Sequence, residues 1–507
     1  MNWDIFTQKH FPLSLTILAL ILILGLGAVL YFPMVNNYYF ADELDPIVAS
    51  QVLKRQMDNG EADLSKLFRS DFIDARDRYN THYRPVGYLF SFLVYRIFGV
   101  EPKFLNLLIV LGHLTTVVLV FFILRRLLDN HLWAFCAALI FAVEGVTSDA
   151  IFYIGAGQLY MPEIIPHYIC LIAFVYWIHN RKTVLLIISW ISALLAIFAN
   201  EFSWPLIPLV WAISYFYGGE RTWKLPFKPR FYPYYLAFTA YIISGYKCIT
   251  SRPEMMESTG WGILARIFSA RHIKRVLDEI DQVFHKIPLA GDILRTLPQY
   301  ILGISVIAVI VFILVYTAVK IKDKRYRFLL LWLVFTLMVL LPVPIAARYL
   351  YHSAVPFWAA ALFIGWYFLE RLKTAFPKWN IKIIGAILYT ILLLIHISMN
   401  YQREHLWSRV GDFYLSRIYN VESALGGLAG TKKIYYLISP GVPERAYDAE
   451  TFSLTQHLRV YLDDPYIQYE LIHSQDFLDT LKLSANEILL SFDGSNFQPL
   501  KFKPDIR

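Results

Sequence analysis

Long apolar stretches alternate with short charged segments along most of this 507-residue chain. Stretches of about 20 apolar residues are long enough to cross a bilayer as helices. The first covers residues 13–32, and no small-residue cleavage site follows it, so we expect a retained helix rather than a removed signal peptide. The pattern predicts about eleven spans, the others near residues 103–124, 132–146, 159–179, 183–199, 203–217, 232–248, 298–319, 328–345, 352–369 and 380–399.

Basic residues between the spans predict the orientation of the chain. Lysine and arginine are enriched in cytoplasmic loops of membrane proteins. The basic clusters fall on alternate sides of successive spans, so all can be cytoplasmic at once; they are Lys9, Arg125 with Arg126, Arg181 with Lys182, and the segments 221–230, 320–327 and 371–382. The opposite side is then extracytoplasmic, and it holds residues 34–102, 147–158, 249–297, 347–351 and everything after 399.

The chain changes character after residue 399. Charge returns, and short β-type runs at 433–439 and 487–492 are separated by Gly, Pro and Asp, which are turn formers. The fold class that we expect is therefore an α-helical polytopic membrane protein with a small C-terminal α/β domain. Its parts are a transmembrane domain, residues 1–399, and an extracytoplasmic soluble domain, residues 400–507.

Composition excludes an ordinary soluble protein. Hydrophobic residues make up 57% of the chain and charged residues 17%, whereas soluble domains carry about 25% charge. The net charge of +8 does not indicate nucleic-acid binding, because the basic residues lie in short clusters between apolar runs rather than on one continuous face. We expect the lipid bilayer, and no nucleic acid, as a partner.

An acidic motif opens the first outer loop, 34–102. The run Phe40-Ala-Asp-Glu-Leu-Asp45 places carboxylates at Asp42, Glu43 and Asp45 directly after the first span, at the membrane surface. A helix start explains such a pattern equally well, with Asp42 as the N-cap and the other acids near the positive end of the helix dipole. The functional hypothesis is a general base.

The same loop ends in Thr81-His-Tyr-Arg-Pro85, followed by an apolar segment too short to cross a bilayer comfortably. We expect a helix lying along the membrane interface. One interpretation is that its tyrosines form an interfacial belt and that Arg84 reaches lipid headgroups. The other is that His82 and Arg84 face a phosphate.

Polar residues also occur at membrane depth, where ionisable groups favour a functional interpretation. Glu144 and Asp149 lie at the outer end of one span; we favour a functional role for Asp149 and leave Glu144 open. Further residues of this kind are Asn106, His113, Glu163, His167, Glu201 and the run Arg348 to His352. They lie at one membrane face, as an extracytoplasmic site requires.

For two pairs among these residues, a structural role is an alternative to a functional one. Glu163 and His167 are one helical turn apart and are candidate metal ligands, although an intrahelical hydrogen bond explains the spacing as well. A divalent metal is therefore possible but unassigned. Asn106 and His113, a heptad apart within a span, are expected to join neighbouring helices by hydrogen bonds.

The order of these motifs resembles the membrane glycosyltransferases of the GT-C superfamily. The block from Phe141 to Ala150 looks like the sequence that protein O-mannosyltransferase relatives write Phe-Ala-Val-His-Pro-Ile-His-Thr-Glu-Ala, and the run from Arg348 to Tyr351 resembles their late Arg-Tyr-Leu-Tyr turn. The resemblance covers residues 1–400. This chain departs at Glu144, Thr147 and Asp149, at Asn200-Glu201, and in the lack of tetratricopeptide repeats after residue 400.

The resemblance implies transfer of a hexose or pentose from a polyprenyl-phosphate donor to a protein, lipid or glycan acceptor, with inversion, at the extracytoplasmic face. Asp42 would be the general base, with Glu43 as the alternative, and Asp149 would orient the acceptor or the sugar. Donor phosphate would be bound by Arg348, with help from Arg84, His82, Tyr349 and Tyr351.

Other functions remain open at this stage. A glycan polymerase or ligase would also use polyprenyl-linked donors. A lipid or solute transporter is less favoured, because no internal repeat is present and the acids lie at one face rather than at the midplane. We expect the bacterial cytoplasmic membrane, with the endoplasmic reticulum as the alternative.

Overall fold

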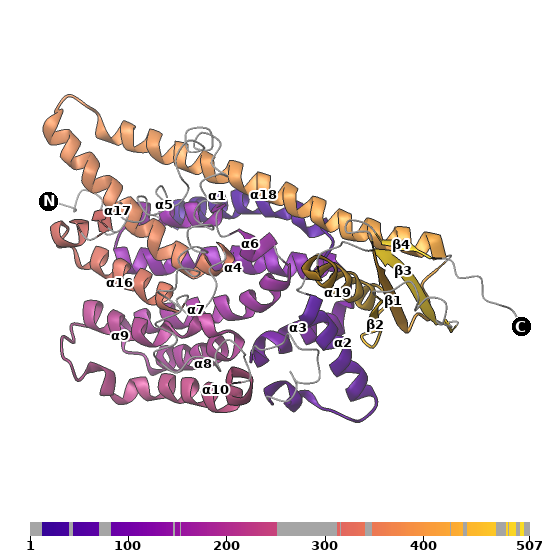
Figure 1. Ribbon diagram of the computed structural model, residues 1–507. Coiled ribbons are helices and arrows are strands. Elements are labelled where there is room, and N and C mark those ends of the chain that lie inside the picture. The colour runs from indigo at the N-terminus through magenta and orange to yellow at the C-terminus, as the bar shows by residue number, and fades with distance from the viewer. Residues whose placement is uncertain are drawn as a thin grey trace, which may run out of the picture.

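The computed structural model describes residues 13–39, 44–69, 83–145, 148–152, 154–250, 312–314, 316–339, 347–425, 427–439, 444–472, 483–484, 486–492 and 497–500. Most of these residues form helices that lie side by side in one bundle, and a small sheet stands at one end (Figure 1). The fold class expected from the sequence is confirmed. The prediction at residues 298–319 lies largely outside the described residues.

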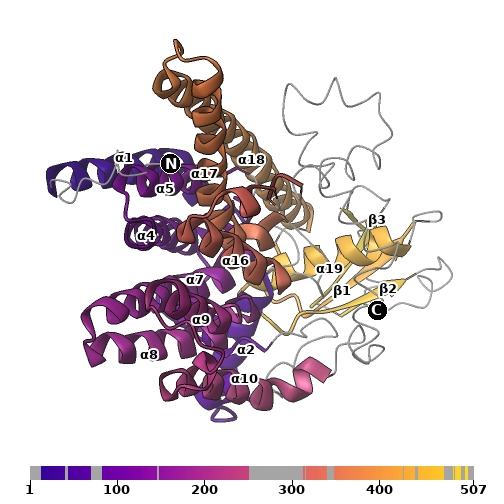
Figure 2. The ribbon, with the colours of Figure 1, turned by 90° about the vertical axis from the view of Figure 1, so that its left-hand side faces the viewer.

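The helices of the bundle follow the apolar runs closely, because an apolar helix in lipid satisfies its backbone groups internally. Helices α4 and α7 lie between a group containing α1, α5 and α17 and a group containing α8, α9 and α10 (Figure 2). The bundle comprises α1 (Leu13–Tyr31), α4 (Pro102–Leu128), α5 (His131–Ala142), α6 (Asp149–Phe152), α7 (Ile154–Asn180), α8 (Thr183–Ala199), α9 (Leu206–Tyr217), α10 (Tyr232–Thr250), α16 (Lys324–Met338), α17 (Tyr351–Ala375) and α18 (Ile381–Leu425).

Within the described residues, five helices are long and apolar enough to cross a membrane. Two of them, α1 and α18, bury only 22% and 11% of their most apolar stretch, so their apolar side chains face outward, where lipid would surround them. The protein is therefore a multi-pass integral membrane protein. The count of about eleven spans remains a prediction.

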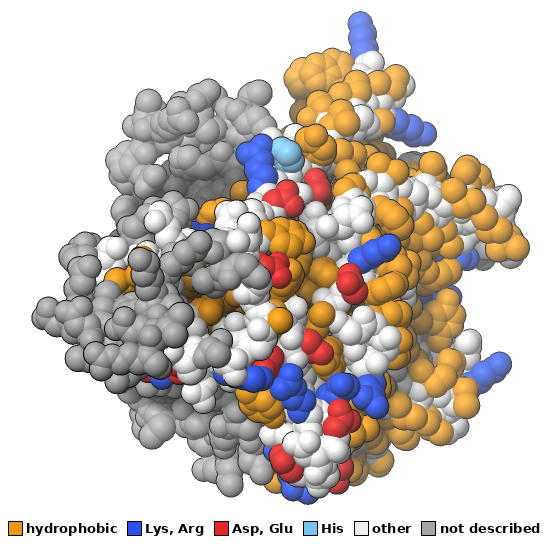
Figure 3. Space-filling model, turned by 90° about the vertical axis from the view of Figure 1, so that its right-hand side faces the viewer, with side chains coloured by type: hydrophobic (Ala, Val, Ile, Leu, Met, Phe, Trp, Pro, Cys, Tyr) orange, Lys and Arg blue, Asp and Glu red, His pale blue; other side chains and the backbone are white. Residues whose placement is uncertain are grey.

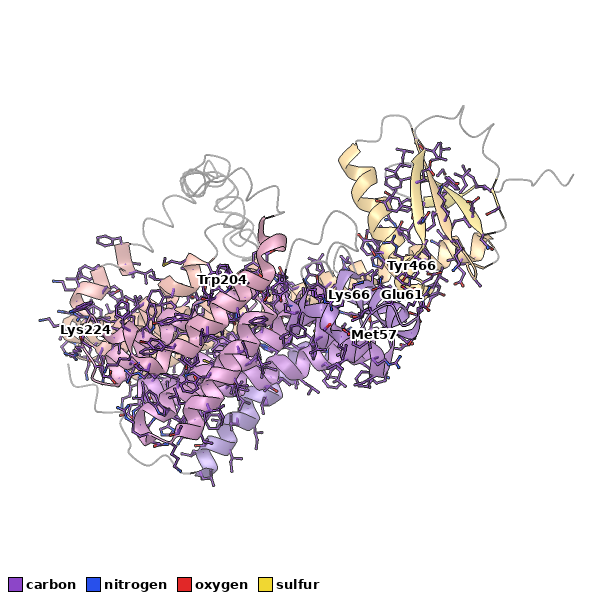
Figure 4. The ribbon with its side chains drawn as sticks, turned by 90° about the horizontal axis from the view of Figure 1, so that it is seen from below. Met57, Glu61, Lys66, Trp204, Lys224 and Tyr466 are labelled. Carbon is purple, nitrogen blue, oxygen red and sulfur yellow. The ribbon has the colours of Figure 1, made fainter. Side chains whose placement is uncertain are left out.

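The first outer loop and the predicted cytoplasmic loops lie at opposite ends of the bundle. The loop contains α2 (Asp45–Asp58), the 3₁₀ helix η4 (Leu64–Phe68) and α3 (Pro85–Phe98). Figure 4 shows Met57, Glu61 and Lys66 at the same end of the molecule as Tyr466 of the C-terminal part, whereas Lys224 lies at the other end. The orientation of these ends relative to the membrane remains a prediction.

Helix α18 joins the bundle to the C-terminal part without a break. It is 45 residues long and runs through residue 400, where the sequence suggested a domain boundary. Its last turns pack against the sheet: Ile418 and Val421 share a core with Ile434 and Phe492. The C-terminal fold therefore includes the end of this helix, and the boundary itself remains a prediction.

The C-terminal sheet has the strand order β2-β1-β3-β4. Strands β1 (Lys433–Ile438) and β3 (Glu487–Phe492) occupy the runs expected from the sequence, joined by β2 (Gln468–Ile472) and β4 (Phe497–Pro499). β1 is parallel to β2 and β3, and β4 is antiparallel to β3. Parallel neighbours need a crossover, which α19 (Glu444–Tyr461) supplies between β1 and β2.

Candidate functional site

Motif residues from distant parts of the chain contact one another inside the bundle. His113 of α4 lies with Nδ1 2.6 Å from the hydroxyl of Tyr351, and its Nε2 lies 3.3 Å from the carbonyl oxygen of Ala142. The His113 ring also packs edge-on against Tyr31, at 4.7 Å between centroids. His113 therefore links the early, middle and late motifs, which confirms that it joins helices.

Asn106 fixes the segment that leads into the acidic motif. This segment is the 3₁₀ helix η2 (Phe32–Asn36). The buried Asn106 amide donates to the carbonyl oxygens of Met34 and Asn37, at 3.0 and 2.9 Å. At Gly411 a Cβ atom would lie 2.8 Å from the carbonyl oxygen of Tyr38, so a glycine lets α18 approach the same segment.

The C-terminal part contacts both flanks of the acidic motif. On one side, His457 Nε2 lies 3.1 Å from the carbonyl oxygen of Tyr39. On the other, in α2, Gln51 donates to Asp463 at 2.9 Å and Arg55 pairs with Asp464 at 3.0 Å. The described residues on both sides of Asp42 and Glu43 therefore contact the C-terminal part.

His457 makes this contact sensitive to pH. Burial lowers the pKa of its imidazole from the ordinary 6.5 to about 4, although the carbonyl oxygens of Ser453 and Tyr39 act in the opposite direction. Between these values the unfolded chain binds a proton that the folded protein does not, so stability is present above pH 6.5 and is lost as the pH falls towards 4. At pH 5 we expect a loss of about 2 kcal/mol.

Thermal unfolding of the purified protein at pH 7.5 and pH 5.0 measures this loss. His457→Gln removes the titrating group, so its melting temperature should fall less than that of the wild type over the same interval. An equal fall in both proteins would assign the pH dependence to other groups.

Asp149 is held by residues of α18 beyond the end of the last predicted span. Arg403 Nη1 lies 2.5 Å from Asp149 Oδ1, and the indole of Trp407 donates to the same oxygen at 3.0 Å. The Arg403 side chain is only 5% exposed. At Gly145 a Cβ atom would lie 2.6 Å from Met399 Cβ, so this glycine admits the close crossing of α18.

Arg84 makes a bidentate ion pair with Glu201. Its Nε and Nη2 atoms each donate to one carboxylate oxygen at 2.9 Å. Arg84 precedes α3, and Glu201 opens the 3₁₀ helix η6 (Glu201–Ser203) between α8 and α9. Burial alone would lower the pKa of Arg84, but the charge and hydrogen bonds of the Glu201 carboxylate together have the larger effect. The pKa therefore lies above its ordinary value, and the guanidinium stays charged. The pair connects the first outer loop to a second one.

A third polar cluster consists of Glu163, His167, Ser203 and His352, and all four side chains are buried. Glu163 Oε2 lies 2.7 Å from His352 Nε2, and Glu163 Oε1 lies 3.5 Å from His167 Nδ1 and accepts from the Ser203 hydroxyl. Among the described residues, one ligand atom each from Glu163, His167 and His352 lie within 4.8 Å of one another. These three side chains form a candidate metal-binding triad.

Two prolines lie in the same part of α7 as this cluster. Prolines 162 and 166 lie inside α7 beside Glu163 and His167, and proline has no backbone N–H to donate within the helix. Ser203 of η6 and His352 of α17 come from two other segments and contact the side chains of Glu163 and His167.

Several predicted site residues are only partly described. Asp42, Glu43 and His82 lie outside the described residues, and nothing is stated of the side chains of Asp45 and Arg348. The backbone of Arg348 belongs to the 3₁₀ helix η9 (Ala347–Leu350).

Other predicted residues are placed clearly. Tyr349 packs 5.2 Å from Phe202, between ring centroids, and Glu144 is buried. The tyrosines of the first outer loop, Tyr83, Tyr88 and Tyr95, are buried rather than exposed, so they do not form a lipid-facing belt.

The polar face of α18 was not predicted from the sequence. His396, Asn400, Arg403 and Trp407 recur at helical spacing, and each contacts the bundle: His396 Nδ1 accepts from Gly145 N at 3.3 Å, and Asn400 donates to the Tyr31 hydroxyl at 2.7 Å. The i, i+4, i+7, i+11 spacing is a signal for one helix face. It is visible only if the last span is extended past Met399.

The end of the molecule that bears the C-terminal part carries charged side chains of both signs, next to an apolar flank (Figure 3). Charge on the end and apolar side chains on the flank are typical of a membrane protein whose flank faces lipid.

No protein-family model matches the chain, and no curated protein matches it. Solved structures with a similar arrangement include the oligosaccharyltransferase AglB from Archaeoglobus fulgidus, with an inhibitory peptide and a dolichol-phosphate (12% identity, TM-score 0.49), and ArnT from Cupriavidus metallidurans, bound to undecaprenyl phosphate (11% identity, TM-score 0.46). The alignments cover 92% of this chain in both cases, with 65% of the archaeal enzyme and 87% of ArnT. Because both TM-scores are below 0.5, the functional conclusion rests on this chain's own residues.

Proposed function

We propose that this protein is an integral membrane glycosyltransferase that transfers a hexose or pentose from a polyprenyl-phosphate donor to an acceptor at the extracytoplasmic face. The acceptor is a protein, a lipid or a glycan. The membrane is the bacterial cytoplasmic membrane, with the site and the C-terminal part on its outer side.

One observation supports the proposal most strongly: Asn106, His113 and Tyr351, which belong to motifs that resemble the GT-C superfamily, lie together beside residues 31–37, the segment that leads to the acidic motif. His113 lies 2.6 Å from the Tyr351 hydroxyl, and Asn106 holds the residues that precede Asp42. A chance set of polar residues would not be expected to converge on the segment that precedes the proposed base.

The proposed chemistry assigns one task to each group. Asp42 accepts the proton of the acceptor nucleophile as that atom bonds to the anomeric carbon, while the bond from this carbon to the phosphate oxygen breaks and its electron pair stays on the phosphate. The configuration at the anomeric carbon inverts. Arg348 stabilises the departing phosphate, because a planar guanidinium binds phosphate oxygens in a fork.

Two further residues orient the reactants in this proposal. Asp149, fixed by Arg403, positions the acceptor or the sugar. Arg84 is paired with Glu201, so it orders the start of α3 and assists phosphate binding from there. Glu43 is the alternative base.

Arg348→Ala tests the phosphate role. Loss of a charged hydrogen-bonding partner should weaken binding of a polyprenyl phosphate about tenfold or more. The measurement is the Kd of reconstituted protein for a short-chain polyprenyl phosphate. Arg327→Ala is the control, because Arg327 is exposed on the predicted cytoplasmic side of α16. Unchanged affinity in Arg348→Ala would remove this residue from the donor site.

Reconstituted wild-type protein tests the donor class. It is incubated with a panel of radiolabelled polyprenyl-phosphate sugars and a membrane extract as the acceptor source, beside a panel of nucleotide sugars. The proposal requires release of lipid phosphate from at least one lipid-linked donor. Turnover of nucleotide sugars alone would contradict it. Transfer of a whole lipid-linked chain would favour a glycan polymerase or ligase.

A further inference from the structure

The triad Glu163, His167 and His352 has the ligand types of a metal site. Catalytic zinc sites commonly use three protein ligands, for example two histidines and a glutamate, and leave a fourth position for water or substrate. One ligand atom from each side chain lies within 4.8 Å of the other two, and the two carboxylate oxygens of Glu163 face the two histidines, Oε2 at 2.7 Å from His352 Nε2 and Oε1 at 3.5 Å from His167 Nδ1.

The spacing of these atoms suits a tetrahedral ion. Zinc bonds of about 2.0–2.1 Å in tetrahedral geometry separate two ligand atoms by about 3.3 Å. The Glu163 contacts of 2.7 and 3.5 Å lie on either side of that value, and the full set of three ligand atoms lies within 4.8 Å. Shifts of less than about 1 Å in side-chain position would bring the three atoms to bonding distance of one ion.

Burial strengthens the case for a cation. Glu163 and His167 are fully buried, and a carboxylate in an apolar bundle needs a compensating positive charge. Among the described residues, the outer ring nitrogens, His167 Nε2 and His352 Nδ1, have no hydrogen-bond partner. The remaining ring nitrogens, His167 Nδ1 and His352 Nε2, face the Glu163 carboxylate.

Ser203 identifies the fourth position. Its hydroxyl lies 3.2 Å from His167 Nδ1 and donates to Glu163 Oε1, so it lies beside two of the three proposed ligands. A hydroxyl there can hydrogen-bond a metal-bound water. Magnesium and calcium prefer oxygen ligands, whereas imidazole nitrogen with one carboxylate suits zinc.

We propose that Glu163, His167 and His352 bind one divalent cation, with zinc preferred, and that Ser203 faces its fourth coordination position. The ion would tie α7 to the start of α17, just after Arg348, and Ser203 would place the η6 turn, which carries Glu201, beside it. Any effect of the ion on the side chains that bind donor phosphate rests on the proposed function. The binding of the ion itself does not rest on the proposed function.

The test uses metal alone, without donor or acceptor. Purified full-length protein is stripped with a chelator and titrated with Co²⁺, whose visible absorption reports coordination by nitrogen and oxygen in a tetrahedral site. We expect one equivalent to bind and Zn²⁺ to displace it, whereas Mg²⁺ should not. Absence of Co²⁺ absorption in the wild type would overturn the proposal and leave a metal-free hydrogen-bond network.

Matched variants locate the site. His167→Gln and His352→Gln should each lose the Co²⁺ signal or weaken its binding at least tenfold. His179→Gln should keep it, because His179 lies on the same helix but at its exposed far end. Equal binding in all three variants would place the metal elsewhere.

X-ray absorption of the zinc-loaded wild type decides the question if the variants fail to fold. The expected spectrum has nitrogen and oxygen neighbours at about 2.0–2.1 Å with imidazole scattering. A spectrum without imidazole would contradict the assignment. Because no turnover is measured, a failure here is distinguishable from a failure of the transferase proposal.

Discussion

Asp42→Asn is expected to lower sugar transfer by a factor of about 10² to 10⁴, which is the usual contribution of a general base. Asparagine has nearly the same shape but cannot take the acceptor proton. Donor binding and expression should stay close to wild type, because the phosphate groups and the contacts around Tyr39 and α2 are untouched. The measurement is the initial rate of lipid-phosphate release at saturating donor.

Asp58→Asn is the matched control for this change. Asp58 lies in the same loop, at the end of α2, and its side chain is 54% exposed in a pair with Lys54. The same substitution there should leave the rate within a factor of about two, because surface changes have small effects. Full activity in Asp42→Asn would eliminate this base, and a large loss only in Glu43→Gln would transfer the role to Glu43.

Asp149→Ala is expected to destabilise the protein by about 3 kcal/mol, because removal of one partner leaves the other charge of a buried pair without compensation. Arg403 is 5% exposed and lies 2.5 Å from the Asp149 carboxylate, so it cannot regain water without moving α18. Transfer should fall as well, since Asp149 is the proposed positioning residue. Chemical unfolding and the transfer assay are run on the same preparation.

A double-mutant cycle separates this ion pair from general packing. Asp149→Ala combined with Arg403→Met should be more stable than the sum of the two single losses predicts, because the double variant has no unpaired charge. Asp58→Ala at the exposed Lys54–Asp58 pair is the control and should cost no more than about 1 kcal/mol. Additive losses from Asp149→Ala and Arg403→Met would mean that the two side chains do not interact.

Apolar run length allowed much of the bundle to be predicted from sequence, because a membrane-crossing helix needs a continuous apolar stretch. The expected span 183–199 coincides with α8, and the expected runs at 433–439 and 487–492 contain β1 and β3. The expected span 132–146 overlaps α5, which ends at Ala142, because the Glu144-Gly145 turn crosses α18 there.

The extent of α18 and the pairing of the polar residues could not be predicted in the same way. Helix α18 continues to Leu425 after the apolar run stops, since its polar face contacts protein rather than lipid. Asp149 and Glu201 were recognised as site candidates, but their partners Arg403 and Arg84 come from distant segments, and a single sequence carries no record of such contacts.

Sugar transfer is tested most directly by the balance between the two products of the wild-type reaction. Reconstituted protein is given a donor labelled in both the sugar and the lipid, and sugar transferred to acceptor is counted against lipid phosphate released. We predict one sugar transferred for each lipid phosphate, with both products strongly reduced in Asp42→Asn. Movement of intact donor across the bilayer, with neither product formed, would contradict it and identify a transporter.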